Sequence, residues 1–428
     1  METGAAPVPE KVNLRLILSD KPVRAVIILV FVFMIGLGII LPILPLFARS
    51  FGVDYAAAGL LISVFGFMRL IGDLVAGGFV ERFGERYAGI GGLALLAVSS
   101  AAAGLAPNYP LVVALWSFGG LGSAVWFASL FSYMLKVVPA ERMGRTLSFF
   151  YGSFNLGIVA GGLFGGLIAD TFGLASPLFF YSGLLVASAF IYLKFVPDPQ
   201  IARAPEPDET GITPAEVLVE RDVAAHPQSR FENLAELFRI KGFATTLLVN
   251  LSYLWLVAAV FDTLLPLFAQ DELGMSTSGI GVIFAVALAT ELVVLYPAGI
   301  FADRYGRKKV LLPSIAGLAV MIIIVGLAES PLSLAVLMGV LGIASGFAGV
   351  PPAAMLSDII PKERSGRAVG VFRFCGDLGF FLGPFLAGIA SEAYGFRTAF
   401  ALVSIPVFLA LVMVIRTPET LKREPAKA

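Results

Sequence analysis

The segment Gly299-Ile300-Phe301-Ala302-Asp303-Arg304-Tyr305-Gly306-Arg307-Lys308-Lys309 has a counterpart 222 residues earlier, Gly77-Gly78-Phe79-Val80-Glu81-Arg82-Phe83-Gly84-Glu85-Arg86. The same offset of 222 continues along the chain: Pro361, Glu363, Arg364, Gly366, Arg367, Gly379, Gly383, Gly388 and Gly395 match Pro139, Glu141, Arg142, Gly144, Arg145, Gly157, Gly161, Gly166 and Gly173. An offset that stays constant over this distance indicates a tandem duplication. Duplicated halves of membrane proteins commonly enclose a central site that the two sides of the membrane reach in turn. The repeat therefore predicts two similar halves around a shared site.

The composition is that of an integral membrane protein. Of the 428 residues, 58% are hydrophobic and 14% are charged, and the mean hydropathy is +0.90. So few charges cannot cover the surface of a water-soluble protein of this size. Stretches long enough to cross ~30 Å of hydrocarbon, at ~20 residues each, are expected at 24–47, 57–80, 87–105, 111–135, 147–169, 176–195, 243–269, 278–302, 310–328, 332–357, 368–390 and 398–415. We predict an N-terminal six-helix bundle in residues 1–195, a cytoplasmic linker in 196–242 and a C-terminal six-helix bundle in 243–428.

The Lys and Arg residues are distributed unevenly about these spans. Of 30 such residues, Arg49 and Arg397 fall at one face, and Arg69 and Arg373 fall inside predicted helices. The remainder lie in the N-terminal arm, the loops of the other face, the linker and the C-terminal tail. The positive-inside rule then places both termini and the linker in the cytoplasm. We expect a multi-pass protein of the cell (plasma or inner) membrane.

The sequence lacks the residues that several classes of function need. The single cysteine, Cys375, excludes an intrachain disulfide and a cysteine-based metal cluster, and the single histidine, His226, lies in the polar linker. The sequence shows no nucleophile–base pair and no cluster of metal ligands, so we expect neither an enzyme nor a bound metal or cofactor. A formal net charge of zero gives no reason to expect nucleic acid as a partner.

The repeated segment resembles the loop signature of the major facilitator superfamily, in which a glycine, an Asp-Arg pair and a second glycine precede basic residues. The first copy departs from it at Glu81, which keeps the acidic charge, and at Glu85, which replaces a base. The resemblance covers nearly the whole transmembrane region. It implies an all-α fold of twelve transmembrane helices, in which two pseudo-symmetric six-helix bundles rock about a central cavity.

The two loops are interpreted as gate latches. Glycines let helix ends approach closely and turn sharply, and an acid beside an Arg can hold a neighbouring helix end in one conformation and release it in another. The gating-loop residues are Gly77, Glu81, Arg82, Gly84, Arg86, Gly299, Asp303, Arg304, Gly306, Arg307 and Lys308.

The spacing of glycines on the helix predicted at 147–169 narrows the resemblance to one subgroup of the superfamily. Gly157, Gly161, Gly162, Gly165 and Gly166 resemble the antiporter motif of drug:proton exporters in this superfamily, and Gly379, Gly383, Pro384 and Gly388 repeat the pattern. Gly162 stands where that family normally has Pro. Trp116 and Gly119 stand where the exporters usually carry an Arg and a Gln ahead of a glycine pair. Because that Arg is often assigned to proton coupling in the family, coupling in this chain would need other residues.

Charged residues inside the predicted helices are the candidates for that role. Arg69 and Asp73 are four residues apart on one helix, and Arg373 and Asp377 on another, so each pair shares a helix face. If the two helices adjoin, as they do in this superfamily, two crossed ion pairs become possible, either as a static clamp or as a switch that protonation opens. Glu291 has no basic partner on its own helix and is a candidate proton carrier or contact for a cationic substrate.

The central cavity in this superfamily is lined largely by the first, fourth, seventh and tenth helices, which are nearly uncharged here. The candidate cavity residues are Phe33, Trp116, Trp126, Phe127, Asn250, Tyr253, Trp255 and Asp262. Asp262 could equally be a solvated carboxylate at the cavity mouth. Aromatic walls favour lipophilic or cationic-aromatic ligands.

We therefore expect a secondary active exporter of hydrophobic or amphipathic small molecules, working as a monomer in the lipid bilayer by proton antiport and alternating access. The alternative is a facilitator or proton symporter for a small neutral nutrient such as a sugar.

Overall fold

The computed structural model of the chain describes residues 21–138, 140–196, 236–361 and 365–421. These residues form helices joined by turns, with no strand among them, which confirms the predicted all-α fold. The predicted linker, 196–242, lies almost entirely outside the described residues, so the domain boundaries stay a prediction.

The first half contains α2 (Lys21–Ile40), α3 (Leu44–Arg49), α4 (Tyr55–Gly104), α5 (Tyr109–Val137), α6 (Ala140–Phe172) and α7 (Ser176–Phe195). Local sequence explains several of these boundaries. The first span is interrupted between α2 and α3 near Pro42 and Pro45, because proline lacks the N–H that a helix interior needs. The side chains of Asp54 and Asn108 cap α4 and α5 by accepting hydrogen bonds from backbone N–H groups three residues on.

The second half contains α11 (Phe243–Leu256), the π-helical segment η1 (Val257–Leu264), α12 (Leu265–Asp271), α13 (Thr277–Tyr305), α14 (Arg307–Val325), α15 (Pro331–Gly349), α16 (Pro351–Ile359), α17 (Ser365–Val403) and α18 (Ile405–Arg416). Ser276 and Ser330 cap α13 and α15 in the same way as Asp54 and Asn108 cap their helices.

Ten segments of the described chain are long and apolar enough to cross a membrane, and two of them, Tyr55–Gly104 and Arg367–Arg416, are 50 residues long. A straight helix of that length would measure about 75 Å, more than twice the hydrocarbon thickness. Each long segment contains one glycine with a non-helical backbone, Gly84 or Gly395, at which the chain reverses. Two passages in each long segment accommodate the twelve spans predicted from the sequence.

The duplication is visible in the backbone of the turns. Six of the seven glycines with positive φ among the described residues form three pairs at the offset of 222: Gly52 and Gly274, Gly84 and Gly306, Gly173 and Gly395. Residues with a Cβ rarely adopt this conformation. The two halves therefore reverse direction at matched points and through the same backbone geometry.

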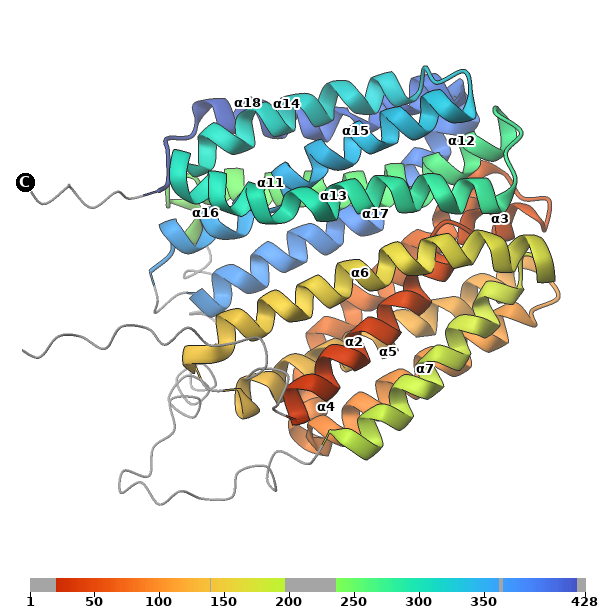
Figure 1. Cartoon of the computed structure of the whole chain (residues 1–428), viewed down its shortest axis with the longest axis horizontal. Helices are drawn as coiled ribbons and strands as arrows, with labels where there is room; N and C mark the ends of the chain where they lie inside the picture. Colours follow the sequence, from red (N-terminus) through yellow and green to blue (C-terminus); the bar gives the residue numbers. More distant parts are fainter. Residues whose placement is uncertain (1–20, 139, 197–235, 362–364, 422–428) are drawn as a thin grey trace, which may run out of the picture.

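The helices form two bundles that lie side by side in Figure 1, the N-terminal bundle of α2–α7 and the C-terminal bundle of α11–α18. The principal contacts between the bundles are made by α4 with α17 and by α6 with α13. Under the offset of 222, the first passage of α4 matches α13, and α6 matches the first passage of α17. The two contacts are therefore equivalent, as a pseudo-twofold axis between the bundles requires.

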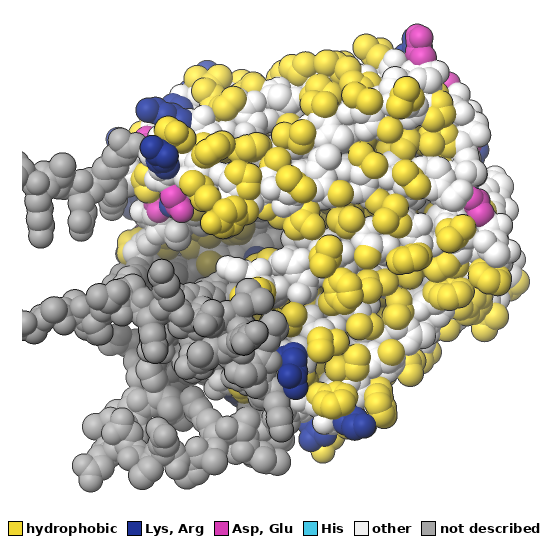
Figure 2. Space-filling view, viewed as in Figure 1, with side chains coloured by type: hydrophobic (Ala, Val, Ile, Leu, Met, Phe, Trp, Pro, Cys, Tyr) yellow, Lys and Arg dark blue, Asp and Glu magenta, His cyan; other side chains and the backbone are white. Residues whose placement is uncertain are grey.

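The two ends of the molecule differ in charge. We call the end with Lys136, Lys194, Lys308 and Arg416 the basic end, and the end with Asp54, Asp170, Asp271 and Glu392 the acidic end. In Figure 2, the Lys and Arg side chains gather mainly at the basic end, and hydrophobic side chains cover the surface between the two ends.

Candidate functional site

Two carboxylates join the bundles at the acidic end. Asp170, on α6, accepts hydrogen bonds from the backbone N–H groups of Thr277 (3.2 Å) and Ser278 (2.9 Å) at the start of α13. Glu392, on α17, accepts one from the backbone N–H of Tyr55 (3.1 Å) at the start of α4. Both interactions satisfy free N–H groups at a helix N-terminus, where a negative charge is favoured. Asp170 and Glu392 are matched at the offset of 222, as are Tyr55 and Thr277, so the two clamps are symmetric.

Glycines bring the backbones of the two bundles into direct contact just below these clamps. A Cβ on Gly166 would overlap the carbonyl oxygen of Thr277, and a Cβ on Gly388 would overlap that of Tyr55. The next matched pair, Gly59 and Gly281, lies against the carbonyl oxygens of Pro384 and Gly162. No larger residue fits these four positions while the acidic end is closed.

A third contact at this end joins matched positions, because Arg49 and Asp271 are related by the offset of 222. The Asp271 carboxylate accepts a hydrogen bond from the Tyr55 hydroxyl (2.7 Å) and lies 3.7 Å from the guanidinium of Arg49, which also stacks 4.4 Å from the centre of the Tyr55 ring. All of these contacts lie between mid-membrane and the acidic end, whereas Figure 2 shows the surface hollowed between the bundles at the basic end. The molecule is closed at its acidic end and open toward its basic end.

The predicted charge bridge between the bundles lies near mid-membrane. The Arg69 guanidinium on α4 lies 3.6 Å from the Asp377 carboxylate on α17. Asp73 interacts electrostatically with Arg69, Asp377 and Arg373. The four residues therefore form one cluster of two acids and two bases; its role in coupling stays a prediction.

Exchanging the two partners of this bridge tests whether the pairing matters. We expect Arg69→Asp and Asp377→Arg each to slow transport about tenfold, because each places two like charges together at the bundle interface. The double exchange should regain most of the loss, since contacting charges couple by on the order of 1–2 kcal/mol. Initial transport rates of the four proteins in liposomes would measure it. A double variant no faster than the slower single variant would show that the pair does not act directly.

Glu291 on α13 lies in the interior of the C-terminal bundle. Its side chain is 8% exposed. Its carboxylate accepts a hydrogen bond from the Tyr253 hydroxyl (2.8 Å). Its position matches that of Arg69 in the first half. The Tyr253 hydroxyl is neutral, so it cannot neutralise a charge on Glu291.

The predicted cavity residues are mostly packed in this conformation. Phe33 and Trp126 stack with their ring centres 3.8 Å apart, and Phe127 and Trp116 also lie buried in the N-terminal bundle. In the second half, the Trp255 indole donates to the carbonyl of Val403 and the Asn250 amide to that of Phe372. Two of the candidates meet a charged group: Tyr253 donates to Glu291, and the Phe127 ring centre lies 5.5 Å from the guanidinium of Arg69. Asp262 is 1% exposed and does not reach a solvated mouth in this state.

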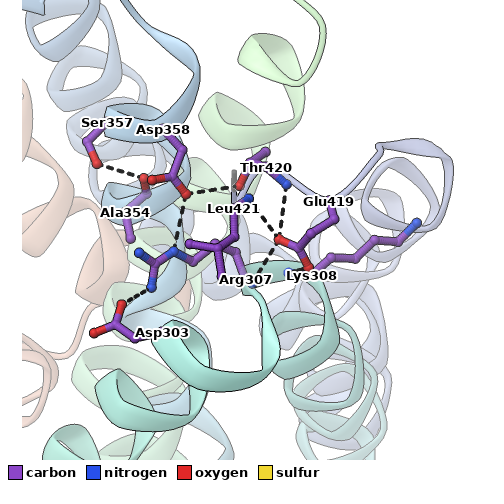
Figure 3. A network of polar contacts seen from close by, with 9 residues as sticks. All are labelled: Asp303, Arg307, Lys308, Ala354, Ser357, Asp358, Glu419, Thr420 and Leu421. Atoms are coloured by element: carbon purple, nitrogen blue, oxygen red, sulfur yellow. Dashed lines mark hydrogen bonds and ion pairs between the residues drawn. The ribbon is translucent and has the colours of Figure 1, made fainter. Parts of the chain in front are cut away.

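The second gating loop is held by a network of ionic contacts at the basic end, which Figure 3 shows. Arg307 contacts Asp303 one turn earlier, and its Nε lies 3.2 Å from a carboxylate oxygen of Asp358 on α16. The Glu419 carboxylate, beyond α18, accepts hydrogen bonds from the backbone N–H groups of Arg307 (2.9 Å) and Lys308 (3.1 Å) at the start of α14. The loop is thereby tied to two other elements of its own bundle.

The first gating loop carries the same ion pair with its charges exchanged. Glu85 lies 2.5 Å from the ammonium of Lys136 on α5 and accepts a hydrogen bond from Ser132 (2.7 Å). At the offset of 222, Glu85 matches Arg307 and Lys136 matches Asp358. The departure of Glu85 from the family signature is therefore compensated on the neighbouring helix.

The basic residues after the turn glycines are also equivalent. Arg86 donates to the carbonyl of Leu193 near the end of α7, and Lys308 donates to that of Ile415 near the end of α18 (2.8 Å). Both pairs match at the offset of 222. Each loop thus holds the end of the last helix of its bundle.

The glycines of these loops differ: the first glycine of each loop makes no close contact, whereas a Cβ on Gly306 would overlap the Glu419 carboxylate. A Cβ on Gly77 or Gly299 would meet no atom within 4 Å, so the close approach that we expected there is not present in this conformation. Gly84 and Gly306 do have positive φ, which agrees with the predicted sharp turn.

Restoring the signature in the first loop requires two changes. We expect Glu85→Arg alone to slow transport several-fold, because it places a second cation beside Lys136. Adding Lys136→Asp recreates the pair of the second half and should restore the rate. A partly exposed ion pair is worth ~1 kcal/mol or less, which sets the size of the effect. Transport assays of the single and double variants would test this, and a double variant as slow as the single one would rule out functional equivalence of the two pairs.

The symmetric clamps at Asp170 and Glu392 were not among the predicted site residues. Their signal was present in the sequence, since both acids and both helix starts obey the offset of 222. What the sequence did not indicate is that each acid faces the helix start of the other bundle.

Comparison with known proteins agrees with this architecture. A family model described as Major Facilitator Superfamily matches residues 26–290 and 247–428. Multidrug resistance protein 1 of Bacillus subtilis is 22% identical over 398 residues, 92% of this chain and 95% of that protein. An uncharacterized MFS-type transporter of Methanocaldococcus jannaschii is 22% identical over 395 residues, 90% of this chain and 96% of that protein.

The fold is also that of solved transporters. The crystal structure of a bacterial homolog of the human lysosomal transporter Spinster, in an inward-facing and occupied conformation, matches with a TM-score of 0.74 at 14% identity. The match covers 92% of this chain and 95% of the other. With a family model matching nearly the whole chain, a duplicated two-bundle fold and an interface closed at one end, this chain belongs to the major facilitator superfamily of membrane transporters.

Proposed function

We propose that this transporter is a monomeric exporter of hydrophobic or amphipathic small molecules that works by proton antiport. The observation that carries the proposal is Glu291, a buried acid near mid-membrane whose hydrogen-bond partner, the Tyr253 hydroxyl, is neutral. A charged side chain at this depth costs roughly 2.5–3.5 kcal/mol on insertion scales. Binding a proton or a cationic substrate removes that cost. The two ligands would therefore compete for one carboxylate, which is the basis of antiport.

The direction of the cycle follows from the orientation. With the basic end in the cytoplasm, as the positive-inside rule favours, the conformation described here is inward-facing. Substrate would enter from the cytoplasm or the inner leaflet and displace the proton from Glu291. Rocking of the bundles would then break the contacts at the acidic end and expose the same carboxylate to the outside.

The substrate class rests on Tyr253, the aromatic candidate that lies beside Glu291. Stacking and cation–π contacts recognise lipophilic and cationic molecules without a fixed pattern of hydrogen bonds. The similarity to Multidrug resistance protein 1 supports the same class. The alternative, a facilitator or proton symporter for a small neutral nutrient, would require several amide and charged groups facing the cavity. Asn250 is the amide among the candidate cavity residues, and its NH2 group already donates a hydrogen bond to the backbone carbonyl of Phe372.

Transport by purified protein in proteoliposomes would test this proposal. Cationic and neutral dyes and neutral sugars would be compared with and without an imposed pH gradient. Accumulation of dyes that requires the gradient and collapses with a protonophore is the expected result. Gradient-independent equilibration of sugars, without movement of dyes, would favour the facilitator.

A further inference from the structure

The span α11–η1–α12 contains an irregularity at the depth where the acidic end is closed. Residues Val257–Leu264 form a π-helix, in which backbone hydrogen bonds run to the fifth residue. Such segments are rare and are frequently found at functional sites. The Thr263 hydroxyl donates to the carbonyl of Ala258, five residues earlier, at 2.8 Å. The segment is packed against α17 and α4.

Asp262 lies within this segment as a buried acid without a partner. Its side chain is 1% exposed, and its Oδ2 has no hydrogen-bond partner. Among the described residues, no charged or titratable side chain on α4, α11, α12 or α17 forms an ion pair or a hydrogen bond with the carboxyl. Tyr253 and Asp271, the titratable groups on the same span, lie nine residues away on either side, roughly 13 Å at helical rise, and are engaged with Glu291 and Arg49.

An isolated carboxylate in this position is unfavourable, and one bound proton removes its charge. A metal cation would need several oxygen ligands, and the described residues contain no group of three or more His, Cys, Asp or Glu side chains that could hold one. We propose that Asp262 is a second proton-binding site of this transporter, which holds a proton while the acidic end is closed and exchanges it with the outside when that end opens. The assignment rests on the proton coupling proposed above. It adds a second proton-binding residue between the closed acidic end and Glu291.

A structural role predicts a different outcome for substitution. An acid that anchors the fold through hydrogen bonds destabilises the protein when it is removed. Asp262 makes no such bond through Oδ2, so Asp262→Asn and Asp262→Leu should keep the thermal unfolding temperature or raise it. Gradient-driven accumulation should fall at least several-fold in both variants.

The protonation itself can be measured without transport. The carbonyl stretch of protonated carboxylic acids in the infrared spectrum of the purified protein should lose intensity in Asp262→Asn. The control is Asp54→Asn, which removes an exposed acid at the acidic end and leaves an equally good helix cap; it should preserve both the band and transport.

The outcomes separate the two proposals. A band that loses intensity in Asp262→Asn, while the wild-type protein shows no gradient-driven accumulation, supports the proton site and refutes proton antiport. A band that is unchanged in Asp262→Asn overturns the proton site, whatever the wild-type protein transports. A lower unfolding temperature in both Asp262 variants with an unchanged band would assign Asp262 a structural role instead.

Discussion

Glu291→Gln should abolish gradient-driven accumulation while substrate exchange without a gradient persists. The glutamine keeps the size of the side chain and can still accept a hydrogen bond from Tyr253, but it cannot release a proton. A gradient of one pH unit stores ~1.4 kcal/mol per proton, enough for about tenfold accumulation by a carrier that exchanges one proton. Loss of the proton site removes this entire factor. Uptake into proteoliposomes with and without the gradient measures it.

Tyr253→Phe is the matched control for this prediction. It removes one neutral donor to Glu291 at 2.8 Å and leaves the carboxyl in place, so coupling should survive with a changed pH dependence. If Glu291→Gln accumulated substrate against its gradient at the wild-type rate, Glu291 could not be the proton carrier. Selective loss of cationic substrates, with neutral ones still accumulated, would instead assign Glu291 to substrate recognition.

The fold could be predicted because the membrane makes its signals simple. The long apolar stretches and the constant offset of 222 can be recognised from composition and repetition alone, without knowing how the helices pack. The bridge between Arg69 and Asp377 was predictable for the same reason, because unpaired charges in hydrocarbon must find partners. The glycine turns at Gly84 and Gly395 define where each long helix reverses.

The charge-exchanged pair in the first loop could not be predicted from the loop alone. In the sequence, Glu85 only replaces a basic residue of the family signature. Its partner Lys136 lies on a different helix, and their contact depends on how α4 packs against α5. The same limit applies to Phe33 and Trp126. Their aromatic character suggested a cavity wall, whereas helix packing turns the two rings toward each other within one bundle.

Gly166→Ala and Gly388→Ala should each shift the protein toward a state that is open at the acidic end. In the structure, a Cβ at either position overlaps a backbone carbonyl of the other bundle, and backbone cannot move aside as a flexible side chain can. Moving a two-state equilibrium from 99:1 to 1:99 takes about 5.5 kcal/mol, a penalty of the order that such an overlap imposes. Transport should fall by at least tenfold, because the closed state is needed in every cycle.

The shift can be observed directly as a distance. Spin labels at Leu105 and Leu332, which are exposed at the acidic end of different bundles, would be introduced after replacing Cys375. Each glycine variant should lengthen the distance between the labels. Gly183→Ala is the first control, since a Cβ there meets no atom within 4 Å, and it should leave both distance and transport unchanged.

Gly165→Ala is the second control and separates gating from folding. Its Cβ would overlap the carbonyl oxygen of Ile39, within the same bundle. This contact cannot be relieved by rocking, so Gly165→Ala should lower the unfolding temperature, whereas Gly166→Ala and Gly388→Ala should not. If Gly388→Ala unfolds the protein as readily as Gly165→Ala, the closed acidic end belongs to the stable core and is not a gate. A folded Gly388→Ala with an unchanged label distance would contradict the gate equally, because it would show that the overlap is absorbed without separating the bundles.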